Sequence, residues 1–191
     1  MAATPLIVFT CTYYPSVSDL RYSQFLDTLE AAQKHGLCIV VVDGSPDDVH
    51  EAMKGTCGGN EKKLIVKQTY QGGKGAALRE AADVAASGGQ GAFEVDSETL
   101  LCWQEPEKTD QMSHWRKVLD AMTAADDVVV PRRTTKLFME SYPIEQYHSE
   151  TYGNLYLDTV MKDAINRSDG STMKLPVADT PTPRGDRKSV V

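Results

Sequence analysis

The sequence lacks the segments that mark membrane-spanning and secreted proteins. The 191-residue chain has no apolar run of about 20 residues, the length needed to cross a bilayer. It also has no basic leader followed by an apolar stretch and a small-residue cleavage site. Its four widely spaced cysteines indicate reduced thiols rather than a disulfide framework. We therefore expect a cytoplasmic protein without a transmembrane segment.

The chain also lacks an excess of positive charge. It carries 20 Lys and Arg against 27 Asp and Glu, which gives a net charge of −7. Binding to the phosphate backbone of a nucleic acid requires a basic face, so we expect no nucleic-acid partner. One small phosphorylated ligand requires only a local cluster of donors and stays compatible with this composition.

Apolar runs and helical periodicity alternate along most of the chain. Strands are predicted at residues 6–10, 37–42, 64–68, 99–103 and 127–130. Helices are predicted at residues 19–34, 48–54, 76–86 and 113–123, and residues 87–92 are predicted to form a loop. Strands that alternate with helices predict an α/β fold with a Rossmann-like, mostly parallel sheet flanked by helices.

The C-terminal part has a weaker pattern. A helix is predicted at residues 152–165, and the polar, Pro-rich residues 166–191 are expected to form a disordered tail. We therefore predict one domain over residues 1–165. The last six residues, 186–191, are interpreted as a sequencing artefact that is foreign to the domain.

Several unusual loops follow the predicted strands. They come after residues 10, 42, 68 and 103, at the carboxyl ends of four strands. Ligands of open parallel sheets bind outside the carboxyl ends of the strands. The sequence therefore predicts a single ligand site at that edge of the sheet.

The loop Gly72-Gly73-Lys74-Gly75 lies between a predicted strand and a helix. Backbone N–H groups at a helix N-terminus bind anions, and glycines allow a phosphate to approach closely. The sequence of this loop excludes a P-loop, which needs Ser or Thr directly after the lysine. It also disfavours the glycine-rich dinucleotide-binding motif, which follows the first strand of a Rossmann fold. The alternative interpretation is a plain strand-to-helix turn with a solvated lysine.

Two acidic segments flank this loop in the chain. Asp43, followed by Gly44-Ser45, can accept hydrogen bonds from a base or ribose, although taken alone an Asx turn or helix cap is favoured. Glu105 and Glu107 can hold a divalent cation, Mn²⁺ or Mg²⁺, that bridges a diphosphate. Exposed acidic loop residues are the equally weighted alternative for that pair.

Other polar residues give weaker signals. Tyr13 and Tyr14 follow the first strand and could stack on a base or pack in the core. Three of the four histidines, His35, His50 and His114, are expected at helix ends or on the surface and receive no role.

Four segments together resemble the family 2 glycosyltransferases of GT-A fold. They are residues 8–15 (VFTCTYYP), 40–48 (VVVDGSPDD), 71–77 (QGGKGAA) and 103–107 (WQEPE), and their order and spacing match over about residues 5–135. The departures are a single acid at Asp43 where the family has two, Tyr14-Pro15 in place of Asn-Glu, and Glu105-Pro106-Glu107 in place of Asp-x-Asp.

The resemblance implies a nucleotide-diphospho-sugar donor, an unknown acceptor hydroxyl and an acceptor-binding half that is short or missing, so that the chain is truncated. It implies that Glu105 and Glu107 face the metal, while Glu145 and Glu150 are weak candidates for the catalytic base. The residues implied to bind the donor are Thr12, Tyr13, Asp43, Gly44, Ser45, Gly73, Lys74 and Gly75.

Two alternatives stay open. A sugar-phosphate nucleotidyltransferase shares the fold, but its glycine-rich loop follows the first strand. A non-catalytic nucleotide-binding module would have the same fold but lack the catalytic base.

Overall fold

The computed structural model describes residues 5–58, 60–123, 129 and 135–168. Its backbone divides into two compact units, Met1–Val128 and Val129–Val190, and each is described here by itself. The first unit holds the sheet and every loop that the sequence assigns to a ligand. The second unit holds two helices.

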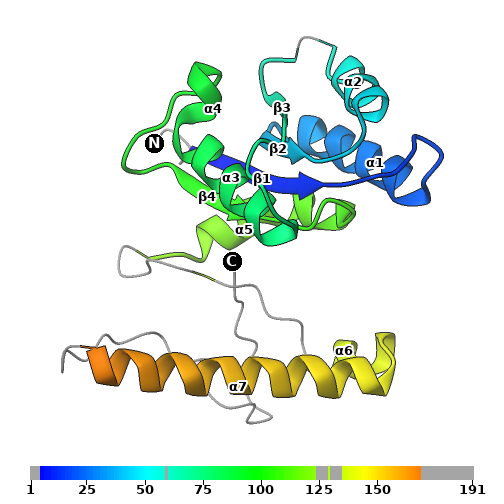
Figure 1. The fold of residues 1–191 in the computed structure, drawn as a ribbon. Helices are drawn as coiled ribbons and strands as arrows, with labels where there is room; N and C mark the ends of the chain where they lie inside the picture. The colour runs from blue at the N-terminus through cyan, green and yellow to red at the C-terminus, as the bar shows by residue number, and fades with distance from the viewer. Residues whose placement is uncertain (1–4, 59, 124–128, 130–134, 169–191) are drawn as a thin grey trace. The chain divides into compact units, whose positions relative to one another are not determined.

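The sheet of the first unit has four parallel strands. They are β1 (Leu6–Thr12), β2 (Cys38–Asp43), β3 (Lys63–Lys67) and β4 (Leu100–Trp103), in the order β3-β2-β1-β4 (Figure 1). All neighbouring pairs are parallel, which confirms the predicted α/β sheet. The strand predicted at residues 127–130 lies outside the described residues except for Val129.

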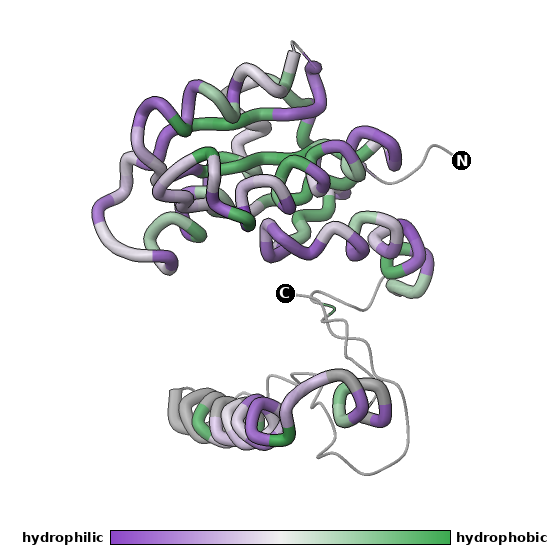
Figure 2. The backbone as a smooth tube through the Cα atoms, turned by 90° about the vertical axis from the view of Figure 1, so that its right-hand side faces the viewer, coloured by the Kyte–Doolittle hydropathy of each residue, from purple (hydrophilic) through white to green (hydrophobic). Residues whose placement is uncertain are grey.

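The central strands are apolar because both of their faces are covered. Ile7 and Val40 pack against Ala85 of α3 (Lys74–Ala86) on one face, whereas the alternate residues Val8 and Val41 point to the other face and are fully buried. Figure 2 shows the hydrophobic residues of this unit concentrated along the strands. The continuous apolar runs of the sequence therefore correspond to a buried parallel sheet.

The first helices follow the predicted pattern. Helix α1 (Leu20–Lys34) begins after Asp19, whose carboxylate accepts the Arg21 N–H at 2.9 Å, and it buries Phe25 and Leu29 against the sheet. Helix α2 (Asp47–Thr56) is slightly longer than predicted. Helix α3 begins at Lys74 rather than at residue 76, so Gly73 is its N-cap.

Two predicted segments differ in detail. The predicted loop 87–92 contains the short helix α4 (Gly88–Gly91), and the predicted helix 113–123 is divided into η1 (Thr109–Ser113) and α5 (Trp115–Asp120). Trp115 is buried, and its indole N–H donates to Gln104 at 2.7 Å.

The second unit contains α6 (Thr135–Ser141) and α7 (Ile144–Ser168). Helix α7 includes the predicted helix 152–165 and starts earlier, because the Pro143 carbonyl accepts the N–H groups of Gln146 and Tyr147 at its first turn. Among the residues that the structure describes, no helix combines the length and apolarity needed to span a bilayer.

Candidate functional site

The candidate site lies at the carboxyl edge of the sheet, where the ends of three strands are in register. Thr12 of β1 is the Cα partner of Asp43 in β2, and Asp43 is the partner of Lys67 in β3. The fourth strand, β4, ends opposite Phe9, where the N–H of Gln104 donates to the Phe9 carbonyl at 3.2 Å. The register therefore places the four predicted loops at one edge.

Asp43 lies at the centre of this edge and is fully buried. Its Oδ1 accepts hydrogen bonds from the Thr12 hydroxyl at 2.9 Å, from the Ser45 N–H at 3.1 Å and from the Ser45 hydroxyl at 2.5 Å. The bond from the Ser45 N–H is the Asx turn that the sequence allowed. In this structure the carboxylate therefore holds two loops together beneath the surface.

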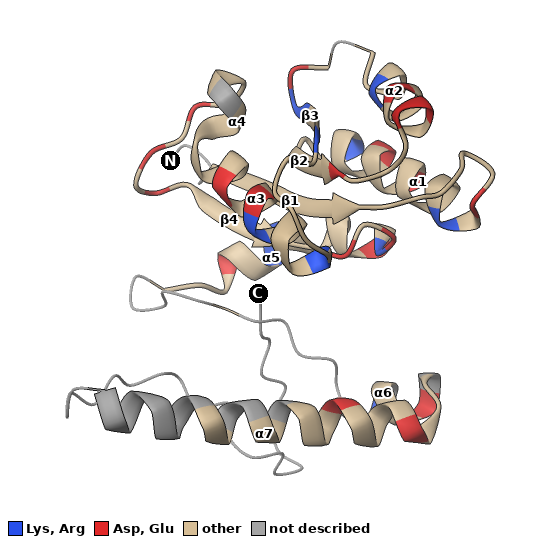
Figure 3. Cartoon of the chain, in the orientation of Figure 1, with Lys and Arg blue, Asp and Glu red and all other residues tan. Residues whose placement is uncertain are grey.

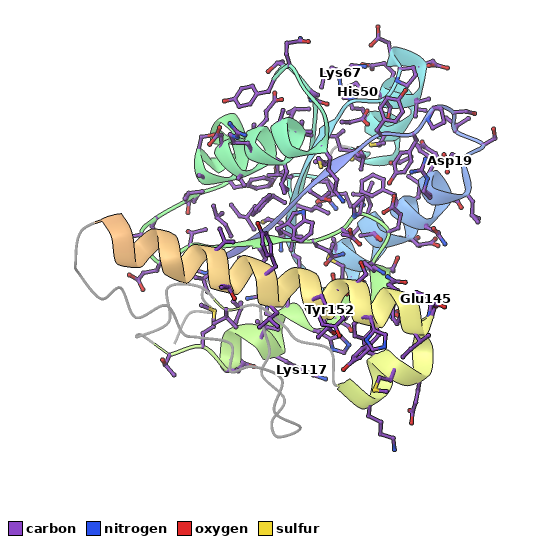
Figure 4. The ribbon with its side chains drawn as sticks, turned by 60° about the horizontal axis from the view of Figure 1, so that its bottom comes forward. Asp19, His50, Lys67, Lys117, Glu145 and Tyr152 are labelled. Atoms are coloured by element: carbon purple, nitrogen blue, oxygen red, sulfur yellow. The ribbon has the colours of Figure 1, made fainter. Side chains whose placement is uncertain are left out.

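The second oxygen of Asp43 pairs with a histidine that the sequence gave no role. His50 Nδ1 lies 2.9 Å from Asp43 Oδ2, and only 7% of the His50 side chain is exposed. His50 lies in the first turn of α2, as expected for a residue at a helix end, but the expectation of a surface position is wrong, because its side chain is buried (labelled in Figure 4). The pair fixes α2 to the end of β2.

Lys67, also labelled in Figure 4, connects the ends of β3 and β2. Its ammonium donates to the backbone carbonyl of Ser45 and to Asp47 Oδ1, the latter at 2.7 Å. The hydrogen bond from Lys67 lowers the pKa of the exposed Asp47 carboxyl.

The loop after β3 is held by a buried glutamate of α3. Glu80 is 5% exposed and accepts hydrogen bonds from the N–H and hydroxyl of Thr69 and from the N–H of Tyr70, at 2.5 to 3.0 Å. Burial alone would raise the pKa of Glu80, but the hydrogen bonds from Thr69 and Tyr70 outweigh it and hold that pKa below its usual value. Glu80 therefore fixes Thr69 and Tyr70, the residues that precede the glycine loop.

A glutamine links this loop to the loop after β2. The Gln68 side-chain amide donates to the Tyr70 carbonyl at 2.8 Å and to the Gly72 carbonyl at 3.4 Å. A Cβ at Gly44 would lie 2.6 Å from Gln68 Oε1. Gly44 therefore leaves the room that the Gln68 side chain occupies.

The glycines of the 72–75 loop serve different purposes. Gly72 has φ +132°, which disfavours any L side chain, and it forms the turn into α3. Gly73 and Gly75 face open space, with nothing within 4 Å of an added Cβ. In the described part of the chain, the N–H groups of Gly73, Lys74 and Gly75 donate to no acceptor, as at any free helix N-terminus.

Lys74 connects the glycine loop to the end of β4. Its ammonium lies 3.4 Å from Glu105 Oε1 and 6.0 Å from the centroid of the Trp103 ring. The Cys11 thiol donates to the Lys74 carbonyl at 3.8 Å. Burial raises the pKa of the Cys11 thiol. Lys74 and Glu105, predicted as parts of one site, are thus in contact.

The two tyrosines after β1 have opposite environments. Tyr13 is 61% exposed, whereas Tyr14 is 1% exposed and packs edge-on against Tyr22. The Tyr14 hydroxyl donates to Glu107 Oε1 at 3.1 Å. Burial, and secondarily the Glu107 carboxylate, raise the pKa of the Tyr14 hydroxyl. Of these two tyrosines, Tyr13 alone is exposed enough to stack on a ligand.

The chemistry of Glu105 and Glu107 fits a divalent cation, since carboxylates are preferred ligands of Mg²⁺ and Mn²⁺ and one or two suffice when a substrate supplies phosphate oxygens. Within the described ranges, no three His, Cys, Asp or Glu side chains gather as a metal site. Glu105 and Glu107 alone are therefore fewer protein ligands than such a group would provide.

The proposed base residues belong to the second unit. Glu145 is exposed in the first turn of α7, and Glu150 accepts a hydrogen bond from Gln146 at 2.9 Å in the same helix. These glutamates and the sheet edge belong to different units, so their role as a base stays a prediction.

Comparison with known proteins finds no matching family model, and no curated protein matches the chain. The fold therefore defines the class. This is an α/β protein whose four-stranded, all-parallel sheet is flanked by helices in a Rossmann-like arrangement. Figure 3 shows charges of both signs spread over the first unit.

Proposed function

We propose that the first unit is a GT-A-type domain that binds a nucleotide-diphospho-sugar in the cytoplasm and transfers the sugar to an acceptor hydroxyl. The observation that carries the proposal is the contact between Lys74 and Glu105, which joins the first residue of α3 to the loop after β4 beside three free backbone N–H groups. An anionic diphosphate fits this combination of an ammonium and helix N–H donors.

The neighbouring loops supply the remaining contacts of the proposal. Tyr13, exposed after β1, would stack on the nucleobase, and the loop Gly44-Ser45 would border it. Asp43 is already saturated with hydrogen bonds, so in this account it shapes the pocket through Thr12 and Ser45. The contacts to the nucleobase would then come from the loop backbone rather than from the buried Asp43 carboxylate.

Glu105 and Glu107 would hold Mn²⁺ or Mg²⁺, which would stabilise the negative charge that develops on the leaving diphosphate. Lys74 would move its ammonium from Glu105 to a phosphate oxygen, because its side chain is 63% exposed and free to rotate. The acceptor hydroxyl needs a base, for which Glu145 and Glu150 of α7 are the candidates.

A lysine substitution with a matched control tests donor binding. Lys74→Met removes the proposed phosphate contact, whereas Lys54→Met breaks another exposed ion pair, with Glu51, that has the same 3.4 Å separation. UDP- and GDP-sugars are titrated by calorimetry in the presence of Mn²⁺ or Mg²⁺. We expect Lys74→Met to weaken binding about ten-fold, as loss of a charge-assisted hydrogen bond does, and Lys54→Met to bind like the wild type.

The outcomes separate the alternatives. No binding of any nucleotide-sugar to folded wild-type protein would refute donor recognition. Binding without hydrolysis or transfer would favour a non-catalytic module. Release of pyrophosphate from a nucleoside triphosphate and a sugar phosphate would favour a nucleotidyltransferase, although the loop after β1, from Tyr13 to Pro15, contains no glycine.

A further inference from the structure

The loop after β4 carries Glu107, which contacts a residue of the loop after β1. Glu107 is half-buried and accepts a hydrogen bond from the Tyr14 hydroxyl at 3.1 Å, across 93 residues of chain. In the described part of the chain, no other residue donates a hydrogen bond to the Glu107 carboxylate. The orientation of this carboxylate is therefore tied to Tyr14.

Tyr14 is itself held rigidly. Its ring is 1% exposed, lies 5.8 Å from the Tyr22 ring and 5.9 Å from the Phe25 ring, and has the Arg21 guanidinium 5.7 Å from its centroid. Its backbone N–H donates to the Ser45 hydroxyl at 2.8 Å. A ring packed on α1 and a backbone fixed to the loop after β2 leave the hydroxyl one direction, toward Glu107.

The contacts form a continuous chain. The Ser45 hydroxyl accepts from Tyr14 N–H and donates to Asp43, which also pairs with His50. The loops after β1, β2 and β4 are therefore connected through hydrogen bonds from the buried Asp43 to Glu107.

We infer that Tyr14 is a positioning residue, which holds Glu107 in the orientation required for the cation and diphosphate of the donor. This inference rests on the proposed function of the edge. It assigns a role to the buried tyrosine, whereas the resemblance implies a ligand contact only for its exposed neighbour Tyr13. Tyr14 acts through Glu107 and touches no substrate.

The chain offers a conservative variant and a matched control. Tyr14→Phe keeps the packed ring and removes only the hydroxyl, whereas Tyr22→Phe removes a hydroxyl from the same aromatic cluster without touching Glu107. Both are compared with Glu107→Ala, which removes the acceptor, and with the double variant Tyr14→Phe/Glu107→Ala in the full chain.

The first readout needs no ligand. Hydrogen exchange of the segment 104–108 is measured by mass spectrometry, and we expect several-fold faster exchange in Tyr14→Phe and unchanged exchange in Tyr22→Phe. Unchanged exchange in Tyr14→Phe would overturn the positioning role, whether or not the protein binds a nucleotide.

The second readout is the affinity for UDP- or GDP-sugar with Mn²⁺. We expect Tyr14→Phe to weaken binding about five-fold, the factor that the loss of one ordinary hydrogen bond gives. In the Glu107→Ala background, where the acceptor is gone, the same change should have less than about two-fold effect, because both changes remove one contact. A full five-fold effect in that background would overturn the inference, while an absence of wild-type binding would refute the proposed function and leave the exchange result to decide the role of Tyr14.

Discussion

The carboxylate of Asp43 and the imidazole of His50 form a buried pair, with 2.9 Å between Oδ2 and Nδ1. The Asp43 side chain is fully buried and the His50 side chain is 7% exposed. The pair connects the last residue of β2 to the first turn of α2, and it stabilises the loop in which Gly44 and Ser45 lie. The centre of the candidate site is therefore built on an internal polar contact.

Substitution of Asp43 should destabilise the fold in proportion to the acceptors it loses. Asp43→Ala leaves the Thr12 hydroxyl, the Ser45 hydroxyl and His50 Nδ1 buried without their acceptor, so we expect a loss of about 3 kcal/mol in the free energy of unfolding. Asp43→Asn keeps one acceptor oxygen and should lose less. Urea unfolding of both variants measures the difference, and equal losses would show that the hydrogen bonds are not the cause.

Glu80 should make stability depend on pH in the acid range. Its pKa in the folded protein lies below the ordinary value of 4.5, so its contribution is fully present above that value and is lost as the pH falls through the folded pKa. We expect Glu80→Gln to cost about 2 kcal/mol at pH 7, since hydrogen bonds to a charged group are lost. The cost should shrink below the ordinary pKa.

Urea unfolding of the wild type and Glu80→Gln at several pH values checks this. A cost that stays constant down to acid pH would contradict the assignment of the effect to the Glu80 charge. Asp83, which accepts from the Tyr70 hydroxyl at 3.0 Å on the exposed side of the same helix, provides the control Asp83→Asn, expected to change stability by less than about 1 kcal/mol.

Alanine substitutions at the adjacent glycines Gly72 and Gly73 should affect stability differently. Gly72→Ala forces a side chain into φ +132°, with Ala76 Cβ only 3.0 Å away, so we expect a loss of at least about 1 kcal/mol in stability. Gly73→Ala meets nothing within 4 Å and should leave stability unchanged within about 0.5 kcal/mol.

The same Gly73→Ala variant should bind a nucleotide-sugar more weakly, because its methyl group would occupy the space through which a phosphate approaches the N–H groups. Thermal unfolding and calorimetry on the two variants give both quantities. Unchanged affinity in Gly73→Ala would place the diphosphate elsewhere.

Much of the sheet could be predicted from the sequence because its signals are local. The apolar runs at Val8 and Val40 can only be strands covered on both faces, and Asp19 has the chemistry of an N-cap. Glycine and proline gave the turns between them. These features depend on neighbours in the chain, so periodicity and turn chemistry were sufficient.

The support of the site could not be predicted, because it depends on distant contacts. In the sequence, His50 is an ordinary helix residue, and only the packing of α2 beside the end of β2 brings it to Asp43. Glu80 lies in an alanine-rich helix, and no local pattern indicates that it accepts a hydrogen bond from Thr69. Tyr13 and Tyr14 are equivalent in sequence, and only packing on α1 decides that the second is buried.

The most direct test of the central claim is a titration followed by the backbone amide signals of the protein in solution NMR. UDP- and GDP-sugars are added in the presence of Mg²⁺, which is diamagnetic, and the signals of Gly73, Lys74 and Gly75 are monitored. The account predicts that these three N–H groups shift most, together with those of the loop Gly44-Ser45. Saturable shifts confined to other elements, such as the exposed face of α1, or no shifts at all would contradict a diphosphate site at the carboxyl edge of the sheet.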